Sequence, residues 1–314
     1  MTDFTTRILN NVATVLVGKD DVTRLALAAI LAGGHVLLED APGTGKTMLA
    51  RALAVSLGLS YRRVQFTPDL LPSDVTGVSV YRDGRFEFVP GPIFTGLLLA
   101  DEINRATPKT QSALLEAMGE GQVTESGVTH RLTQPFVVVA TQNPIEHEGT
   151  YRLPEAQLDR FVVKLSVGYP TVQQEAEMLA RLQQRHPIET LQPVATPQEL
   201  LSAQAQVRSI RVDPDLQAYV AQLSASSRQH PQVALGGGPR ASLALQSVAQ
   251  ALAFLQGRSF VTPGDLKRAA PAVLTHRLSL TTEARLTGVR PEAVVAAVLQ
   301  DLPVPVEASA PELR

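Results

Sequence analysis

Residues 35–47 read HVLLEDAPGTGKT, and this stretch decides the fold of the first half of the chain. The apolar run at residues 35–38 predicts a buried strand, and residues 46–57 predict a helix. A glycine-rich turn separates the two elements. A strand, such a turn and a helix in this order present backbone N–H groups and the positive end of the helix to one anion. The stretch therefore predicts a phosphate-binding loop.

The turn matches the pattern G-x-x-x-x-G-K-[ST], known as Walker A, except at its first position, where Asp40 replaces glycine. In this pattern the lysine reaches the outer phosphates of ATP and the hydroxyl residue binds Mg²⁺, roles that fall to Lys46 and Thr47. Asp40 either points away from the phosphates or weakens nucleotide binding by charge repulsion. The predicted nucleotide-binding residues of the loop are Pro42, Gly43, Thr44, Gly45, Lys46 and Thr47.

A second apolar strand ends in two acids, as Walker B motifs do, and reads Leu97-Leu98-Leu99-Ala100-Asp101-Glu102. Adjacent acids at the end of a buried strand are costly unless a cation or a water network uses them. Asp101 is the candidate Mg²⁺ ligand, acting through water, and Glu102 is the candidate general base for the attacking water. For this segment alone, a strand that runs into a solvated turn is the better interpretation, but the phosphate loop favours the catalytic one.

A third apolar strand, at residues 136–140, is followed by Thr141-Gln142-Asn143-Pro144. A neutral amide in this place could lie beside the γ-phosphate and orient water, which makes Asn143 a candidate catalytic residue. Asparagine before proline is also ordinary turn chemistry. The catalytic interpretation of Asn143 therefore depends on the other two motifs.

The chain as a whole predicts an α/β core at residues 1–169, with a mostly parallel sheet flanked by helices. Further strands are expected at residues 61–65 and 162–165, and hairpins near residues 76–90 and 121–133 look like insertions. From residue 170 to residue 314 helical patterns dominate, which predicts an all-α second domain. Its expected helices are residues 173–184, 197–208, 214–228, 240–256 and 291–302.

Composition limits the function classes. Lys and Arg total 28 against 30 Asp and Glu, aromatic residues make up 4% of the chain, and Trp is absent, which argues against nucleic acid as a partner. The chain contains no Cys, which excludes disulfides and thiolate metal sites, and its histidines lack the spacing of a zinc site. No signal peptide or membrane span is expected, so we expect a soluble, cytoplasmic protein.

Taken together, these motifs resemble, in order and spacing, those of AAA+ ATPases. LDRF at residues 158–161 and GPR at residues 238–240 belong to the same resemblance. Within that superfamily, five longer stretches are similar to the MoxR family. They are HVLLE (35–39), DEINRA (101–106), QSALLEAM (111–118), ATQNPIE (140–146) and GTYRLPEAQLDRF (149–161).

The resemblance implies an AAA+ P-loop NTPase core with a helical lid, and Mg²⁺-dependent hydrolysis of ATP to ADP and phosphate. It implies that Arg160 is a finger inserted into the ATP of a neighbouring subunit, and that Arg240, at the start of a lid helix, contacts the γ-phosphate of its own chain. Val17 and Gly18 would lie near the adenine pocket, with Lys19 after them in place of an expected glutamine.

The same resemblance implies a ring, expected to be a hexamer, that acts as a chaperone-like remodeller of a protein client with a von Willebrand factor A domain partner. One alternative is a nucleic-acid-dependent AAA+ motor or transcription regulator, which the near-neutral charge and few aromatics disfavour. Another is an assembly switch that binds ATP and hardly hydrolyses it, which Glu102 and Arg160 argue against. The sequence names neither client nor partner.

Overall fold

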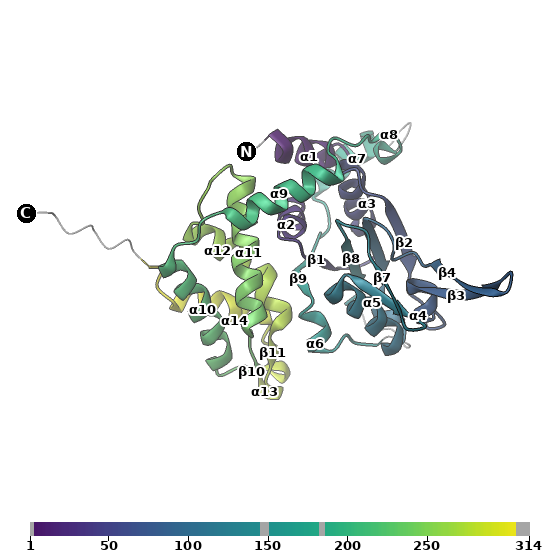
Figure 1. Ribbon diagram of the computed structural model, residues 1–314. Helices are drawn as coiled ribbons and strands as arrows, with labels where there is room; N and C mark the ends of the chain where they lie inside the picture. The colour runs from purple at the N-terminus through teal and green to yellow at the C-terminus, as the bar shows by residue number, and fades with distance from the viewer. Residues whose placement is uncertain (1–2, 145–150, 182–185, 306–314) are drawn as a thin grey trace, which may run out of the picture.

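Five parallel strands form the central sheet, in the order β2-β5-β8-β1-β9 (Figure 1). The computed structural model describes residues 3–144, 151–181 and 186–305. The strands predicted from the sequence are confirmed, within one or two residues at their ends. They are β1 (His35–Glu39), β2 (Tyr61–Gln65), β5 (Leu97–Asp101), β8 (Val137–Gln142) and β9 (Phe161–Leu165).

Helices cover both faces of the sheet because alternate side chains of the strands point to opposite sides. Val36 and Leu38 of β1 join one hydrophobic cluster, and Leu37 joins the other. The first cluster packs α1 (Asp3–Ala13), α2 (Asp20–Leu31) and α3 (Lys46–Ser56) against the sheet. The second packs α5 (Pro108–Glu120) on the opposite face. Such double coverage explains the continuous apolar runs of the central strands.

Two antiparallel hairpins leave this core where the sequence predicts insertions. The first, β3 (Gly77–Arg82) with β4 (Arg85–Pro90), follows the short helix α4 (Pro72–Thr76) and projects from the body of the molecule (Figure 1). The second pairs β6 (Gln122–Glu125) with β7 (Val128–Arg131). Phe88 of the first stacks on His130 of the second, with 3.8 Å between ring centroids, so the hairpins support each other.

The lid is helical, as predicted, and also contains elements that the sequence patterns did not reveal. A pair of short antiparallel strands, β10 (Val233–Leu235) and β11 (Ser279–Leu280), interrupts the expected all-α domain. The helix at Pro263–Leu274 was likewise not predicted. The lid helices are α9 (Pro197–Ser209), α10 (Pro214–Gln229), α11 (Pro239–Leu255), α12 (Pro263–Leu274), α13 (Thr282–Leu286) and α14 (Pro291–Asp301).

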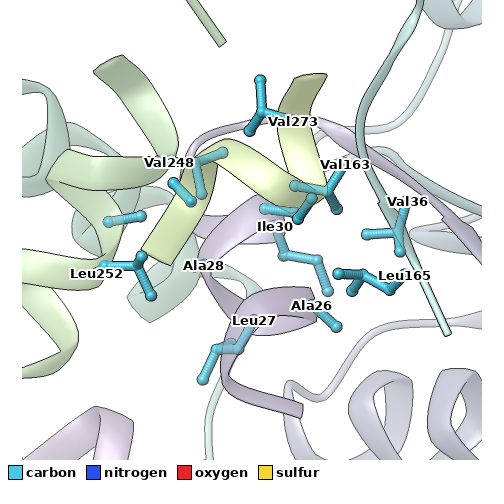
Figure 2. Close-up of a cluster of buried hydrophobic side chains, with 14 of the residues drawn as sticks. Ala26, Leu27, Ala28, Ile30, Val36, Val163, Leu165, Val248, Leu252 and Val273 are labelled. Carbon is cyan, nitrogen blue, oxygen red and sulfur yellow. The ribbon is translucent and has the colours of Figure 1, made fainter. Parts of the chain in front are cut away.

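Core and lid share one hydrophobic cluster, with α2 between them (Figure 2). Figure 2 shows Ile30 of α2 between Val163 of the sheet and Val248 of the lid. The lid is therefore fixed against the core through α2. This packing decides which edge of the sheet the first turn of α11 approaches.

The segment between β9 and the lid carries α7 (Val172–Arg181) and α8 (Pro187–Thr190). The predicted helix at residues 173–184 extends past Arg181 into residues that are outside the described ranges, as are motif residues 145–150. The domain boundary at residue 170 stays a prediction. Within the described ranges, no helix combines the length and the apolar character that crossing a bilayer requires.

Candidate nucleotide site

The carboxyl ends of β1, β5 and β8 open on one cleft of about 340 Å³. The strands are parallel and adjacent, so the residues that follow them meet at the same edge of the sheet, where open α/β sheets bind ligands. The cleft unites the residues of all three predicted motifs. It is lined by Pro42, Gly43, Thr44, Gly45, Lys46, Thr47, Met48, Asp101, Glu102, Thr141, Gln142 and Asn143.

The phosphate loop owes its shape to two glycines in left-handed backbone. Gly43 has a φ of 82° and Gly45, which caps α3, has a φ of 96°, values that residues with side chains rarely adopt. The first N–H groups of α3 are thereby left facing the cleft, as anion sites at helix starts require. Lys46 donates from Nζ to the carbonyl oxygens of Asp40 and Ala41. Partial burial lowers the pKa of Lys46, against the raising effect of the acids around it.

Asp101 is buried and held from two sides. Its Oδ1 accepts a hydrogen bond from Thr141 Oγ1 at 2.5 Å, and its Oδ2 lies 2.6 Å from Nη2 of Arg63 on β2. Thr47 and Asp101 bring a hydroxyl and a carboxylate oxygen to the same cleft, and Mg²⁺ prefers both kinds of donor. The donor set therefore fits the ion that the sequence predicts.

Glu102 stands in left-handed backbone, with a φ of 54°, a strained conformation for a residue with a side chain. Its backbone N–H donates to Thr141 Oγ1 at 2.8 Å. Its Oε2 accepts hydrogen bonds from Gln65 Nε2 and Arg105 Nη1, each at 2.9 Å. The candidate base is thus oriented at the rim of the cleft by β2, by β8 and by the turn that follows β5.

Sequence reasoning missed the residues that orient these acids. Thr141 precedes the predicted Asn143 by two residues, and its position at the end of an apolar strand is the sequence feature that could have indicated it. No sequence pattern could have indicated Arg63 and Gln65, because only the order of strands in the sheet brings β2 next to β5.

A second, largely apolar hollow adjoins the cleft and shares Gly43 and Gly45 with it. Val17 and Lys19 line it, where the sequence predicts the adenine pocket. Gly18 lies between them with a φ of 65°, and a Cβ there would come within 1.9 Å of Gln174 Nε2. A larger residue at this position would push the Gln174 side chain aside and would adopt a left-handed backbone that favours glycine.

The two predicted arginines lie at the amino ends of the strands, opposite the phosphate loop. Arg160 directly precedes β9, and both Arg160 and Arg240 line a hollow with Gly33 and Gly34, which precede β1. A five-residue strand spans about 16 Å, so this hollow is separated from the phosphate loop by the length of β1. In this structure the expected contact of Arg240 with the γ-phosphate site of its own chain is therefore not formed. The physical reason is the packing of α11 on α2, which brings the start of α11 to the amino ends of the strands.

Asp159 pairs with two arginines at this end of the sheet. We call Asp159, Arg160, Arg240 and Arg277 the arginine edge. Its Oδ1 lies 2.7 Å from Nε of the buried Arg277, and its Oδ2 lies 3.6 Å from Nη1 of Arg240. Arg277 also donates to the carbonyl oxygen of Phe161, at 2.8 Å. Arg160 donates from Nη1 to the carbonyl of Leu115 in α5. The side chain of Arg240 is 70% exposed, so it is open to a neighbouring molecule.

Comparison with known proteins agrees with this architecture. The ATPase family associated with various cellular activities (AAA) matches residues 35–163, and the AAA lid domain matches residues 225–298. YeaC of Bacillus subtilis (strain 168), itself uncharacterized, is 52% identical over 306 residues, which cover 97% of this chain and 96% of YeaC. Chaperone MoxR1 of Mycobacterium tuberculosis is 42% identical over 310 residues, covering 95% of this chain and 82% of MoxR1.

A solved structure extends the similarity to three dimensions. The crystal structure of an ATPase candidate from Cytophaga hutchinsonii superposes on this chain with a TM-score of 0.89. The two sequences are 36% identical, and the match covers 96% of each chain. Both the parallel core and the helical lid therefore recur in that protein.

Proposed function

The chain belongs to the MoxR family of AAA+ ATPases, and we propose that it hydrolyses ATP to ADP and phosphate, with Mg²⁺, at a site completed by a neighbouring subunit. One observation carries this proposal. The phosphate cleft and the arginine edge lie at opposite ends of the parallel strands. A contact that joins these two unlike surfaces between copies is heterologous, and such contacts close into rings when the rotation permits.

Each residue of the cleft has a proposed role. The N–H groups of the loop and Lys46 bind the outer phosphates, and Thr47 and Asp101 hold Mg²⁺. The ion supplies charge neutralisation on the phosphate oxygens. Glu102 accepts a proton from the attacking water, and Asn143 orients that water. The hollow beside Val17 and Gly18 receives the base.

Arg160 and Arg240 act on the nucleotide of the adjacent subunit in this proposal. Their guanidinium groups stabilise the charge that develops on the transferred phosphoryl group. The common position of both side chains at one edge, with Asp159 beside them, supports a joint role. Arg240 is thereby reassigned from its own site to that of the neighbour.

We further propose that turnover drives the remodelling of a protein client by a ring, expected to be a hexamer. The name of the relative MoxR1, a chaperone, supports this role. The projecting β3–β4 hairpin offers a surface away from the nucleotide cleft, with Tyr81 and Phe86 well exposed. A von Willebrand factor A domain protein is the proposed partner, on the family resemblance alone.

Subunit mixing tests the shared site. Arg160→Ala should bind ADP like the unaltered protein and have little turnover, and Glu102→Gln should also bind and hardly turn over. Mixed assemblies should regain part of the activity, because some interfaces then pair an intact Glu102 with an intact Arg160. Lys46→Ala mixed with Glu102→Gln is the matched control, since both changes disable the same cleft and no rescue is expected. Rescue in the control, or none in the test mixture, would contradict the proposal.

A further inference from the structure

Asp40 replaces the first glycine of the phosphate-loop pattern, and its carboxylate points away from the cleft. Oδ1 accepts a hydrogen bond from the N–H of Ala41 at 2.9 Å. Oδ2 accepts one from the N–H of Gly168 at 2.6 Å and one from Ser166 Oγ at 2.9 Å. The end of β1 is thereby fastened to the segment that leaves β9.

Lys19 holds the other side of the same peptide. Its Nζ donates to the carbonyl oxygen of Gly168 at 2.9 Å and to that of Tyr169 at 3.1 Å. Gly168 has a φ of 68°, so a glycine is needed where its N–H and C=O face these two partners. We call Asp40, Ser166, Gly168 and Lys19 the Gly168 clasp.

The clasp lies between the two parts of the nucleotide site. Asp40 directly precedes the loop that lines the phosphate cleft, whereas Lys19 and Pro170 line the apolar hollow. Pro170 follows Gly168 by two residues, so the position of the Gly168 peptide sets the position of this wall. Val167 packs into the hydrophobic core next to Gly168, and the clasp adds the polar contacts that orient the Gly168 peptide.

We propose that Asp40 and Lys19 are positioning residues that fix the distance between the phosphate loop and the base-binding wall, so that both ends of one nucleotide are held together. This inference rests on the proposed nucleotide-binding function. The alternative is that the negative charge of Asp40 repels the phosphates. Three hydrogen-bond donors already occupy its oxygens, which directs its charge to the protein rather than to the cleft.

The ionisation of Asp40 agrees with this geometry. Partial burial by itself raises the pKa of Asp40, but the hydrogen bonds from Gly168, Ser166 and Ala41, with the charge of Lys46, lower it below its ordinary value. Asp40 is thus an anion at neutral pH, with two oxygens that accept.

Asp40→Asn is a sharp test because an amide has only one accepting oxygen. Whichever way it turns, it cannot accept from both Ala41 and Gly168. Lys19→Met keeps the aliphatic stem and removes the donors. Matched controls lie far from the clasp: Asp83→Asn at the hairpin turn, where a φ of 48° suits asparagine, and Lys267→Met on the exposed surface of α12.

The measurement is calorimetric titration with ADP and, separately, with inorganic pyrophosphate, which can contact only the phosphate side. Each clasp variant should raise the Kd for ADP about tenfold, the loss expected for a charged hydrogen bond, and change the Kd for pyrophosphate about twofold or less. The double variant should lose less than the product of the single losses, because both residues act through Gly168. Both controls should match the unaltered protein.

Three outcomes would overturn the clasp. Tighter binding of ADP by Asp40→Asn would mean that charge repulsion by Asp40 dominates. Equal losses of affinity for ADP and for pyrophosphate would mean general damage to the phosphate loop. Unchanged affinities for both ligands would mean that the clasp has no role in binding. A second readout needs no nucleotide: the Gly168 amide should exchange with solvent faster in Asp40→Asn than in Asp83→Asn. If the unaltered protein and the variants bind ADP with equal affinity, only the clasp is contradicted. If the unaltered protein binds no ADP, the proposed function is contradicted as well.

Discussion

Thr141 connects the two acids of the cleft through a single hydroxyl group. The hydroxyl donates to Asp101 and accepts the backbone N–H of Glu102. Its partners are a proposed metal ligand and a proposed base, so one small side chain orients both. The N–H of Glu102 follows the end of β5 and precedes the short 3-10 helix at Ile103–Arg105, so Thr141 supplies its acceptor.

Thr141→Val therefore should lower both stability and turnover. Valine has nearly the shape of threonine but leaves the Glu102 N–H without its acceptor, at a cost of about 1–3 kcal/mol in the free energy of unfolding. Turnover should fall about ten- to a hundredfold because both acids lose their orientation. Urea unfolding and steady-state ATP hydrolysis measure the two effects. Thr124→Val, at an exposed position of β6, is the control, and equal behaviour of the two variants would refute the role.

At the scale of elements, the junction of β9, α6 (Glu155–Leu158) and the lid positions the arginine edge. Arg277 reaches from the turn after α12 to Asp159 and to the carbonyl of Phe161. Burial lowers the pKa of Arg277, while its bond to Asp159 acts in the opposite direction. Asp159 adjoins Arg160 in the chain, so a lid residue controls where the proposed finger stands.

Arg277→Met should destabilise the junction by about 2–3 kcal/mol, because it removes hydrogen bonds to a charged partner and to buried carbonyls. Rescue of Arg160→Ala by Glu102→Gln should also weaken when Arg277→Met is added to the Glu102→Gln subunit, because that subunit supplies Arg160. Arg268→Met is the control, because its ion pair with Asp21 is exposed and such pairs contribute about 0–1 kcal/mol. Urea unfolding of both variants decides the matter: similar losses would show that the Arg277 contacts add nothing.

At the scale of the whole molecule, the proposed shared site would make turnover depend on assembly. ATP hydrolysis per subunit should rise with protein concentration until the rings are complete, because a lone subunit lacks the arginines of its neighbour. Dilution series of the hydrolysis rate, compared with the mass measured by light scattering, give the test. A rate per subunit that stays constant while the assembly dissociates would contradict a shared site.

Two buried histidines make the stability of the molecule depend on pH. Burial lowers the pKa of His35 to about 4, and burial with the charge of Arg277 lowers the pKa of His276 well below its ordinary value. Below the ordinary pKa of 6.5 the unfolded chain binds more protons than the folded one, so the free energy of unfolding falls as pH falls. Each histidine contributes up to about 1.4 kcal/mol per pH unit in this window.

Urea unfolding at about pH 7 and about pH 5 measures this slope, in a range where carboxyl groups with ordinary pKa values contribute little. His35→Gln keeps a donor and an acceptor near Val138 and Met118 but does not titrate in this range, so its slope should be smaller. An equal slope in this variant would exclude His35 as a source.

The sequence by itself determined the phosphate loop, the strands that carry the acids and Asn143, and the helical character of the second half. Each of these is a local pattern, in which neighbours along the chain set the backbone shape and the chemistry together. That is why the cleft residues could be predicted as a group before any contact was known.

Only the tertiary structure decided which residues surround that group. The sheet order brings Arg63 and Gln65 to the acids, the packing of α11 on α2 carries Arg240 to the edge opposite the loop, and the path of the chain after β9 turns Asp40 toward Gly168. These contacts join residues far apart in the chain, and no local pattern encodes their distances. The loop predicts the ligand class, and the fold decides which residues lie around the cleft.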